Sequence, residues 1–171
     1  MLLIVVLRFV HILSGAIWAG SLVFLTVFLE PTARALGPAG GQLMGELMRR
    51  KLTPFMLAMA LLAILAGLSL FWIDSQGFTA KNWLETRAAT AYQIGAGCAL
   101  LAAIIGGAVQ RPATEKMGKI GPELAKAPAG AQRDAMAAEA EQLRGRIKLY
   151  GRIITLLVLV ALSCMAIARY I

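Results

Sequence analysis

Residues 2–29 have the sequence LLIVVLRFVHILSGAIWAGSLVFLTVFL, in which Arg8 and His11 are the only ionisable side chains. An α-helix needs roughly 20 apolar residues to cross a hydrocarbon layer about 30 Å thick, and this run is longer than that. The Glu30-Pro31 pair that follows predicts the end of the helix, because proline disfavours helical backbone at the residue before it. We therefore predict a transmembrane helix over residues 2–29.

Three further apolar runs have the length of a membrane span. They cover residues 52–73, 88–109, which Gln110-Arg111-Pro112 ends, and 149–168. Thr53-Pro54 predicts either an N-cap and a first turn at the head of the second span or a kink in a longer helix that enters from the region of Leu43. The whole chain is 59% hydrophobic and only 15% charged, whereas soluble domains are about 25% charged. The sequence thus predicts an all-α fold: a four-helix transmembrane bundle forming a single domain, residues 1–171.

The distribution of basic residues predicts how this bundle is oriented. The loops after the first and third spans carry twelve Lys and Arg side chains, whereas the loop after the second span carries two, Lys81 and Arg87. Because short cytoplasmic loops collect Lys and Arg, we expect both termini outside and a multi-pass protein of a bacterial-type inner (plasma) membrane. The net charge of +8 is then a consequence of topology, and we expect membrane lipid rather than nucleic acid as the partner.

The loop at 111–148 is the largest segment outside the predicted spans. Glycines and prolines at positions 118, 121, 122, 128 and 130 predict that its first half is broken. From residue 131 onward an apolar face recurs at helical spacing, formed by Met136, Ala140, Leu143, Ile147 and Tyr150. We expect a cytoplasmic amphipathic helix leading into the last span, lying either at the membrane interface or against residues 43–47.

Small residues recur every fourth position along the third span, at Gly95, Ala99, Ala103 and Gly107. In lipid such spacing lets helix backbones approach closely, because van der Waals packing replaces the hydrophobic drive. These residues therefore predict helix packing, either inside the bundle or at a seam with a second copy or a larger membrane complex.

Polar residues inside the spans are the first candidates for function. Arg8, His11 and Trp18 share one face of the first span, and the third span adds Tyr92 and Gln93. His11 lies deep enough to need a partner. One reading is a neutral histidine hydrogen-bonded to Tyr92, Gln93 or a backbone carbonyl, and the other is a histidine that binds a ligand or moves a proton.

A metal site at this histidine would have few companions in the chain. Cys98 lies at nearly the same depth as His11, but one histidine and one cysteine do not complete a closed metal site. Haem bound by the single histidine would need a methionine, an open sixth position or a symmetric dimer. No carboxylate lies within a span, so the sequence predicts no catalytic residue.

The stretch RFVHILSGAIWAG at residues 8–20 resembles the opening helix of the CopD-like superfamily of small membrane proteins. EPTAR at 30–34, MRRK at 48–51 and ILAGL at 64–68 are also similar. The superfamily includes copper-uptake membrane domains and haem-pathway protoporphyrinogen oxidases. The resemblance equates His11 with the superfamily histidine, and Trp18 and Gly20 with its Trp-x-Gly pair. The oxidases continue with an arginine and a second histidine, whereas this chain has SLVFLT at 21–26.

Three functional hypotheses follow. The first is a non-enzymatic membrane protein of CopD-like type that binds copper or haem b, with His11, Trp18 and Tyr92 as cofactor-binding residues and His11 and Cys98 as metal ligands. The second is an accessory or scaffold subunit of a larger membrane complex, without cofactor. The third is a membrane redox enzyme of haem metabolism. The sequence leaves open whether any cofactor is bound.

Overall fold

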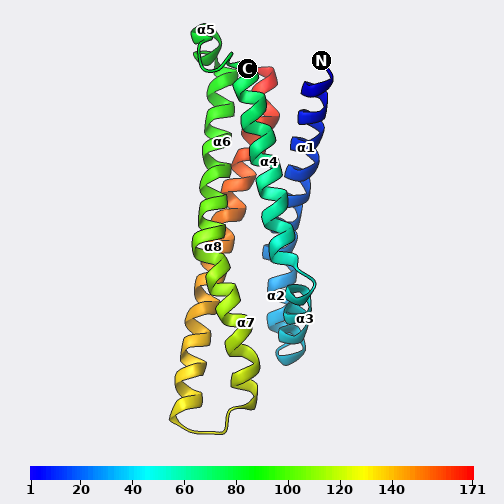
Figure 1. Ribbon diagram of the computed structural model, residues 1–171. Helices are drawn as coiled ribbons and strands as arrows, with labels where there is room; N and C mark the ends of the chain where they lie inside the picture. Colours follow the sequence, from blue (N-terminus) through cyan, green and yellow to red (C-terminus); the bar gives the residue numbers. More distant parts are fainter.

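The computed structural model describes all 171 residues, as helices and short connections without a β-strand. Four helical segments are long and apolar enough to cross a membrane: Leu2–Ala35, Leu52–Asp74, Arg87–Lys126 and Ala131–Tyr170. They run side by side in one elongated bundle, with both termini at the same end (Figure 1). The chain is thus an all-helical, four-span integral membrane protein, as predicted.

Each long segment is built from shorter elements. The first consists of α1 (Leu2–Val23), the π-helical turn η1 (Phe24–Leu29) and α2 (Glu30–Ala35), after which come α3 (Pro38–Arg49) and α4 (Leu52–Asp74). The second half of the chain comprises α5 (Lys81–Leu84), α6 (Arg87–Ile105), the π-helical turn η2 (Gly106–Gln110), α7 (Arg111–Lys126), α8 (Ala131–Ile167) and the short 3₁₀ helix η3 (Ala168–Tyr170).

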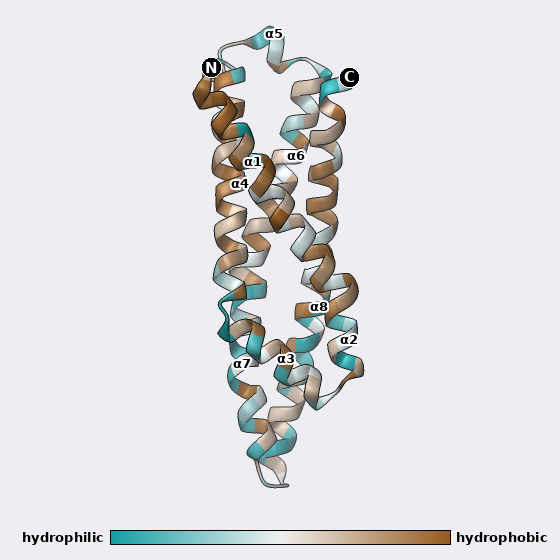
Figure 2. Cartoon of the chain, turned by 90° about the vertical axis from the view of Figure 1, so that its right-hand side faces the viewer, coloured by the Kyte–Doolittle hydropathy of each residue, from teal (hydrophilic) through white to brown (hydrophobic).

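The bundle has two chemically different ends. We call the end with both chain termini and α5 the terminal end, and the end with α2, α3, α7 and the first half of α8 the basic end (Figure 1). Figure 2 shows hydrophobic residues along the middle of the bundle and hydrophilic residues concentrated at the basic end. Many large apolar side chains in the middle are exposed, including Phe9, Leu65 and Leu156, as expected for a surface that faces lipid.

The four spans pack as two pairs. α1 packs mainly on α4, and α6 packs mainly on α8. The pairs are joined by a central cluster with members from all four spans: Trp18, Ala19, Leu22, Ala60, Ala102, Ile154 and Val158. Five of these seven residues are Ala, Val or Ile, so the pairs meet over a thin apolar layer.

Two prolines predicted to end helices do not end them. Pro31 and Pro112 each follow a π-helical turn, in which the amide N–H groups of Glu30 and Arg111 donate to Leu25 and Gly106, five residues back. A proline ring normally clashes with the carbonyl four residues earlier. The wider π turn moves that carbonyl away, so the helix continues into α2 and into α7.

The first half of the loop at 111–148 is helical, contrary to the prediction of a broken segment. α7 spans it as far as Lys126 with Pro122 inside the helix. Its apolar side chains pack on the amphipathic part of α8 in a second cluster formed by Ala113, Ile120, Ala140 and Leu143. The amphipathic face of α8 therefore packs on α7, a partner that the sequence did not predict.

α3 folds back beside α2 at the basic end. Gly37, with φ at 56°, makes the turn, and a Cβ on Gly40 would overlap the carbonyl of Ala33, so only glycine permits this approach. α4 then starts after Lys51 in a left-handed conformation, and no side chain caps it. The predicted N-cap, Thr53, instead donates its hydroxyl to the sulfur of Met48.

Candidate functional site

The imidazole of His11 is held by the backbone of α4. Its Nδ1 lies 2.7 Å from the carbonyl oxygen of Ala63. Because a carbonyl can only accept, Nδ1 carries the proton in this hydrogen bond. In a neutral imidazole this arrangement leaves Nε2 with a free lone pair. The partner is thus a backbone carbonyl, one of the alternatives drawn from the sequence.

A glycine of α4 makes room for this ring. A Cβ placed on Gly67 would come within 2.7 Å of Cε1 and 2.9 Å of Nδ1 of His11. Real Cβ atoms do not approach other atoms so closely, so any larger residue at position 67 would displace the imidazole. Gly67 lies in ILAGL at 64–68, the last of the sequence stretches that resemble the CopD-like superfamily, and the structure brings it against the first, which contains His11.

The other predicted cofactor residues are not joined to His11 by a hydrogen bond. Trp18 is buried, 7% exposed, within the central cluster. Tyr92 and Cys98 are half-buried on α6, which packs mainly on α8, whereas His11 packs on α4. No group of three or more His, Cys, Asp or Glu residues is arranged to hold a metal ion. Arg8 is exposed.

The small residues of the third span occupy different environments. Gly95 is buried against α8, where an added Cβ would lie 3.2 Å from the carbonyl oxygen of Ala161 and 3.1 Å from Cε of Met165. Ala99 and Ala103 pack against the central cluster. Gly107 is exposed, and an added Cβ would meet nothing within 4 Å.

A cavity of about 200 Å³ lies between the four spans on the basic side of the central cluster. Its apolar part includes Trp18, Leu22, Ala60, Ala102 and Ile154, and its polar part includes Thr26, Gln110, Glu30 and Arg111. Sequence reasoning missed this site. The signal was present in Thr26 and Gln110, two polar residues just before the Glu30-Pro31 and Arg111-Pro112 pairs, but it was interpreted only as the end of a span.

Hydroxyl groups connect the first and last spans beside this cavity. The hydroxyl of Thr155 donates to the carbonyl of Gly151 at 2.8 Å, so its oxygen accepts from the hydroxyl of Thr26 at 3.0 Å. An added Cβ on Gly151 would lie 3.5 Å from Nε2 of Gln110 and 3.9 Å from Oγ1 of Thr26. Both side chains therefore converge on Gly151, in the part of the bundle where the two π turns lie.

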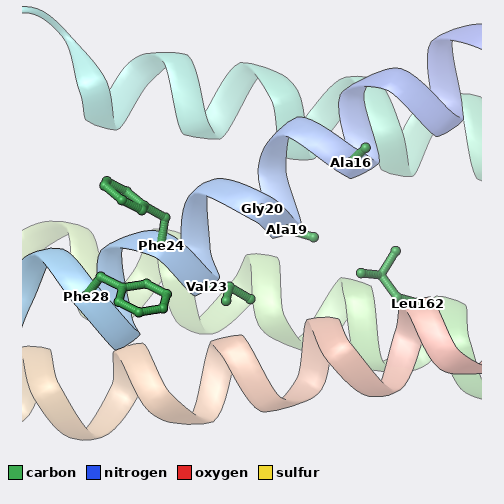
Figure 3. Close-up of a pocket in the computed structure, with 7 residues that line it drawn as sticks. All are labelled: Ala16, Ala19, Gly20, Val23, Phe24, Phe28 and Leu162. Atoms are coloured by element: carbon green, nitrogen blue, oxygen red, sulfur yellow. The ribbon is translucent and has the colours of Figure 1, made fainter.

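A second hollow lies between α1 and α8 and is purely apolar. Figure 3 shows its lining, with Ala16, Ala19, Gly20 and Val23 on α1, Phe24 and Phe28 on the π turn, and Leu162 on α8. Its volume is about 540 Å³, but no hydrogen-bonding side chain lines it. It offers no chemistry, in contrast to the cavity between the spans.

Comparisons with protein-family models, with curated proteins and with solved structures found nothing that matches this chain. The resemblance to the CopD-like superfamily therefore rests on the quoted stretches of sequence alone.

Proposed function

We propose that the chain is a non-enzymatic integral membrane protein of CopD-like type that binds a haem through His11. In this proposal the basic end faces the cytoplasm of a bacterial-type cell and both termini lie outside. Support for the orientation comes from the twelve Lys and Arg side chains in the loops at the basic end, against two at the terminal end.

The observation that carries the proposal is the hydrogen bond between His11 and Ala63. Histidines that bind metals almost always donate their second ring N–H to a carbonyl, carboxylate or water, which fixes the ring and its tautomer. The 2.7 Å contact from Nδ1 does this for His11 and leaves Nε2 as the free ligand atom.

The residues present fit haem better than copper. Haem iron takes a single histidine as its proximal ligand, and the sixth position can stay open or come from a second copy of the chain. Copper would need further ligands beside His11, and no group of three or more His, Cys, Asp or Glu residues is arranged to hold a metal ion. Bound haem would supply reversible one-electron chemistry, and the chain's own part is to present Nε2 and exclude water. Trp18, two turns further along α1, and Tyr92 are the proposed neighbours of the group.

The test is an absorption spectrum with iron and copper analysis of the detergent-purified protein after growth with a haem precursor. We expect a Soret band that His11→Ala abolishes. Gly67→Ala should shift or weaken it, because the added Cβ moves the imidazole. Gly97→Ala, whose Cβ meets nothing within 4 Å, is the matched control and should leave the spectrum unchanged. A wild-type protein without a Soret band after haem reconstitution would contradict the proposal.

An accessory subunit without cofactor is the alternative. The face first expected to contact a partner is largely occupied, because Gly95 already packs on α8. Of the four small residues that recur along the third span, Gly107 alone is exposed. A Gly107→Leu substitution should therefore release a co-purifying partner in this case, whereas it should leave a haem at His11 in place.

A further inference from the structure

The cavity between the spans changes in polarity along its length. Trp18 lines its deep end, and Thr26 and Gln110 line the part nearer the basic end. Trp18 and Thr26 are eight residues apart on one helix, which corresponds to about 12 Å along the bundle. Glu30 and Arg111 follow at the opening. The site is therefore apolar at one end and polar at the other.

The polar part has an unused hydrogen-bond donor. The hydroxyl protons of Thr26 and Thr155 are both taken by the chain of hydrogen bonds that ends at Gly151. The side-chain amide of Gln110 makes no hydrogen bond within the protein, although Gln110 lines the cavity. Every fully buried polar side-chain atom has a partner, so this amide faces accessible space. A ligand that accepts a hydrogen bond would satisfy it.

The charge around the opening favours an anion. Glu30 is neutralised by Arg34 at 2.8 Å, and Arg111 binds Glu115 through Nε alone, which leaves its other N–H groups free. At this opening Arg111 thus keeps N–H groups that no carboxylate of the protein occupies.

From these three features we propose that the cavity binds an alkyl carboxylate with a single hydrocarbon chain. The methyl end of the chain lies toward Trp18, and the carboxylate lies at Gln110 and Arg111. The volume agrees, because an apolar cavity of about 150 Å³ holds benzene, so about 200 Å³ holds roughly eight carbon atoms. α3 forms one wall through Met44 and Met48, flexible apolar side chains that adapt to a ligand.

This inference does not depend on haem at His11, and its test uses Trp18 as the reporter. The Trp72→Phe/Trp83→Phe double variant leaves Trp18 as the sole tryptophan. In phosphatidylcholine nanodiscs, 8-bromooctanoate should cause a saturable loss of most Trp18 fluorescence, since bromine quenches on contact. 2-Bromooctanoate, with bromine beside the carboxylate, should quench far less.

Two variants distinguish an alkyl carboxylate bound in the cavity from one dissolved in the surrounding bilayer. Ala103→Phe fills the cavity and should abolish the saturable quenching, whereas Gly97→Leu on the same helix points into open space and should preserve it. Gln110→Leu keeps the volume and should weaken the apparent affinity roughly tenfold, the effect of one lost hydrogen bond to a charged group. Gln110→Leu therefore tests binding in the cavity even if Ala103→Phe does not fold.

Three results would overturn the proposal. The first is quenching that rises without saturation and matches that of brominated phosphatidylcholine, because the bromine then reaches Trp18 from the bilayer. The second is saturable quenching that Ala103→Phe and Gln110→Leu leave unchanged. The third is stronger quenching by 2-bromooctanoate, since the carboxylate would then lie at the deep end.

Discussion

The two helix pairs reach close contact by different means. In the α1–α4 pair, a glycine of one helix lies beneath an imidazole of the other, and a hydrogen bond from His11 to the Ala63 carbonyl crosses the interface. In the α6–α8 pair, Gly95 lies directly against the backbone of α8, near the Ala161 carbonyl, with no side-chain hydrogen bond between the two surfaces at that point. Both solutions use glycine, but the side chain beside Gly67 is the polar imidazole of His11, whereas those beside Gly95 belong to Met165 and Cys164.

The difference has a physical origin in the solvent. Lipid tails are as apolar as the side chains, so helices in a membrane associate through close van der Waals packing and interhelical hydrogen bonds. The α6–α8 pair relies on van der Waals packing, and the α1–α4 pair relies on both packing and an interhelical hydrogen bond. A pair held by packing alone has no polar atom to offer a ligand, whereas the α1–α4 pair keeps Nε2 of His11 available.

The largest effect is expected at the α6–α8 contact. Gly95→Leu should destabilise the protein by about 1–3 kcal/mol, because the new side chain must displace backbone and not only flexible atoms. Thermal unfolding in detergent measures this change. Gly97→Leu, two residues along the same helix and facing open space, should unfold like the wild type. Equal stability of Gly95→Leu and Gly97→Leu would remove the distinction between the pairs.

A smaller effect is expected at the α1–α4 contact. Gly67→Ala should cost about 1 kcal/mol, since the imidazole can rotate away from the new Cβ but then loses its hydrogen bond to Ala63. In a His11→Ala background the same substitution should cost nearly nothing, because the ring it meets is absent. A double-mutant cycle of thermal stabilities measures this coupling. Additive effects would show that the two residues do not touch.

The hydrogen bond between Thr26 and Thr155, which joins the two helix pairs, should contribute still less to stability. Thr155→Val removes the hydrogen bond to Thr26 and keeps the side-chain volume, so we expect a loss of about 0.6 kcal/mol, the mean for such bonds in membranes. Ser163→Ala removes only a hydrogen bond to its own helix at Leu159 and should have no measurable effect. Unfolding in a graded detergent mixture compares the two variants. A loss as large as that of Gly95→Leu would mean that the hydroxyls, and not the backbones, hold the bundle.

The smallest effect is expected outside both pairs, on α3. Hydrogen bonds from Arg49 and Arg50 hold the pKa of the Glu46 carboxyl below its usual range. Their stabilisation is therefore fully present above the usual carboxyl pKa and is lost as pH falls through the lowered value. Because the group is exposed and screened, Glu46→Gln should change the unfolding temperature only slightly at neutral pH and low salt. This small difference should vanish in acid and at high salt, and a difference that persists under both conditions would contradict an ionic origin.

Much of the architecture could be predicted from the residues themselves. The lengths of the apolar runs are sufficient to place the four spans, since the thickness of a bilayer sets them. The amphipathic spacing of Met136, Ala140 and Leu143 correctly predicts a helix leading into the last span. It does not predict the partner of that face, because α7 was expected to be broken at Gly118 and Pro122. Local propensity is overridden there by packing against α8.

The candidate sites divide in the same way. That His11 needs a partner follows from its depth in an apolar run, which is a property of the sequence. That the partner is the Ala63 carbonyl, with Gly67 beneath the ring, depends on the register between α1 and α4. No local pattern encodes that register.

What the sequence alone determined is thus everything set by one-dimensional spacing: four spans, their approximate limits, a lone intramembrane histidine and the concentration of basic residues in two loops. Tertiary structure alone decided where the helices continue past Pro31 and Pro112, which helix covers which, and where the cavity lies. The physical reason is that a π turn and a cavity both depend on neighbouring helices. Thr26 and Gln110 are separated by more than eighty residues along the chain, and they converge on Gly151 only because three spans meet there.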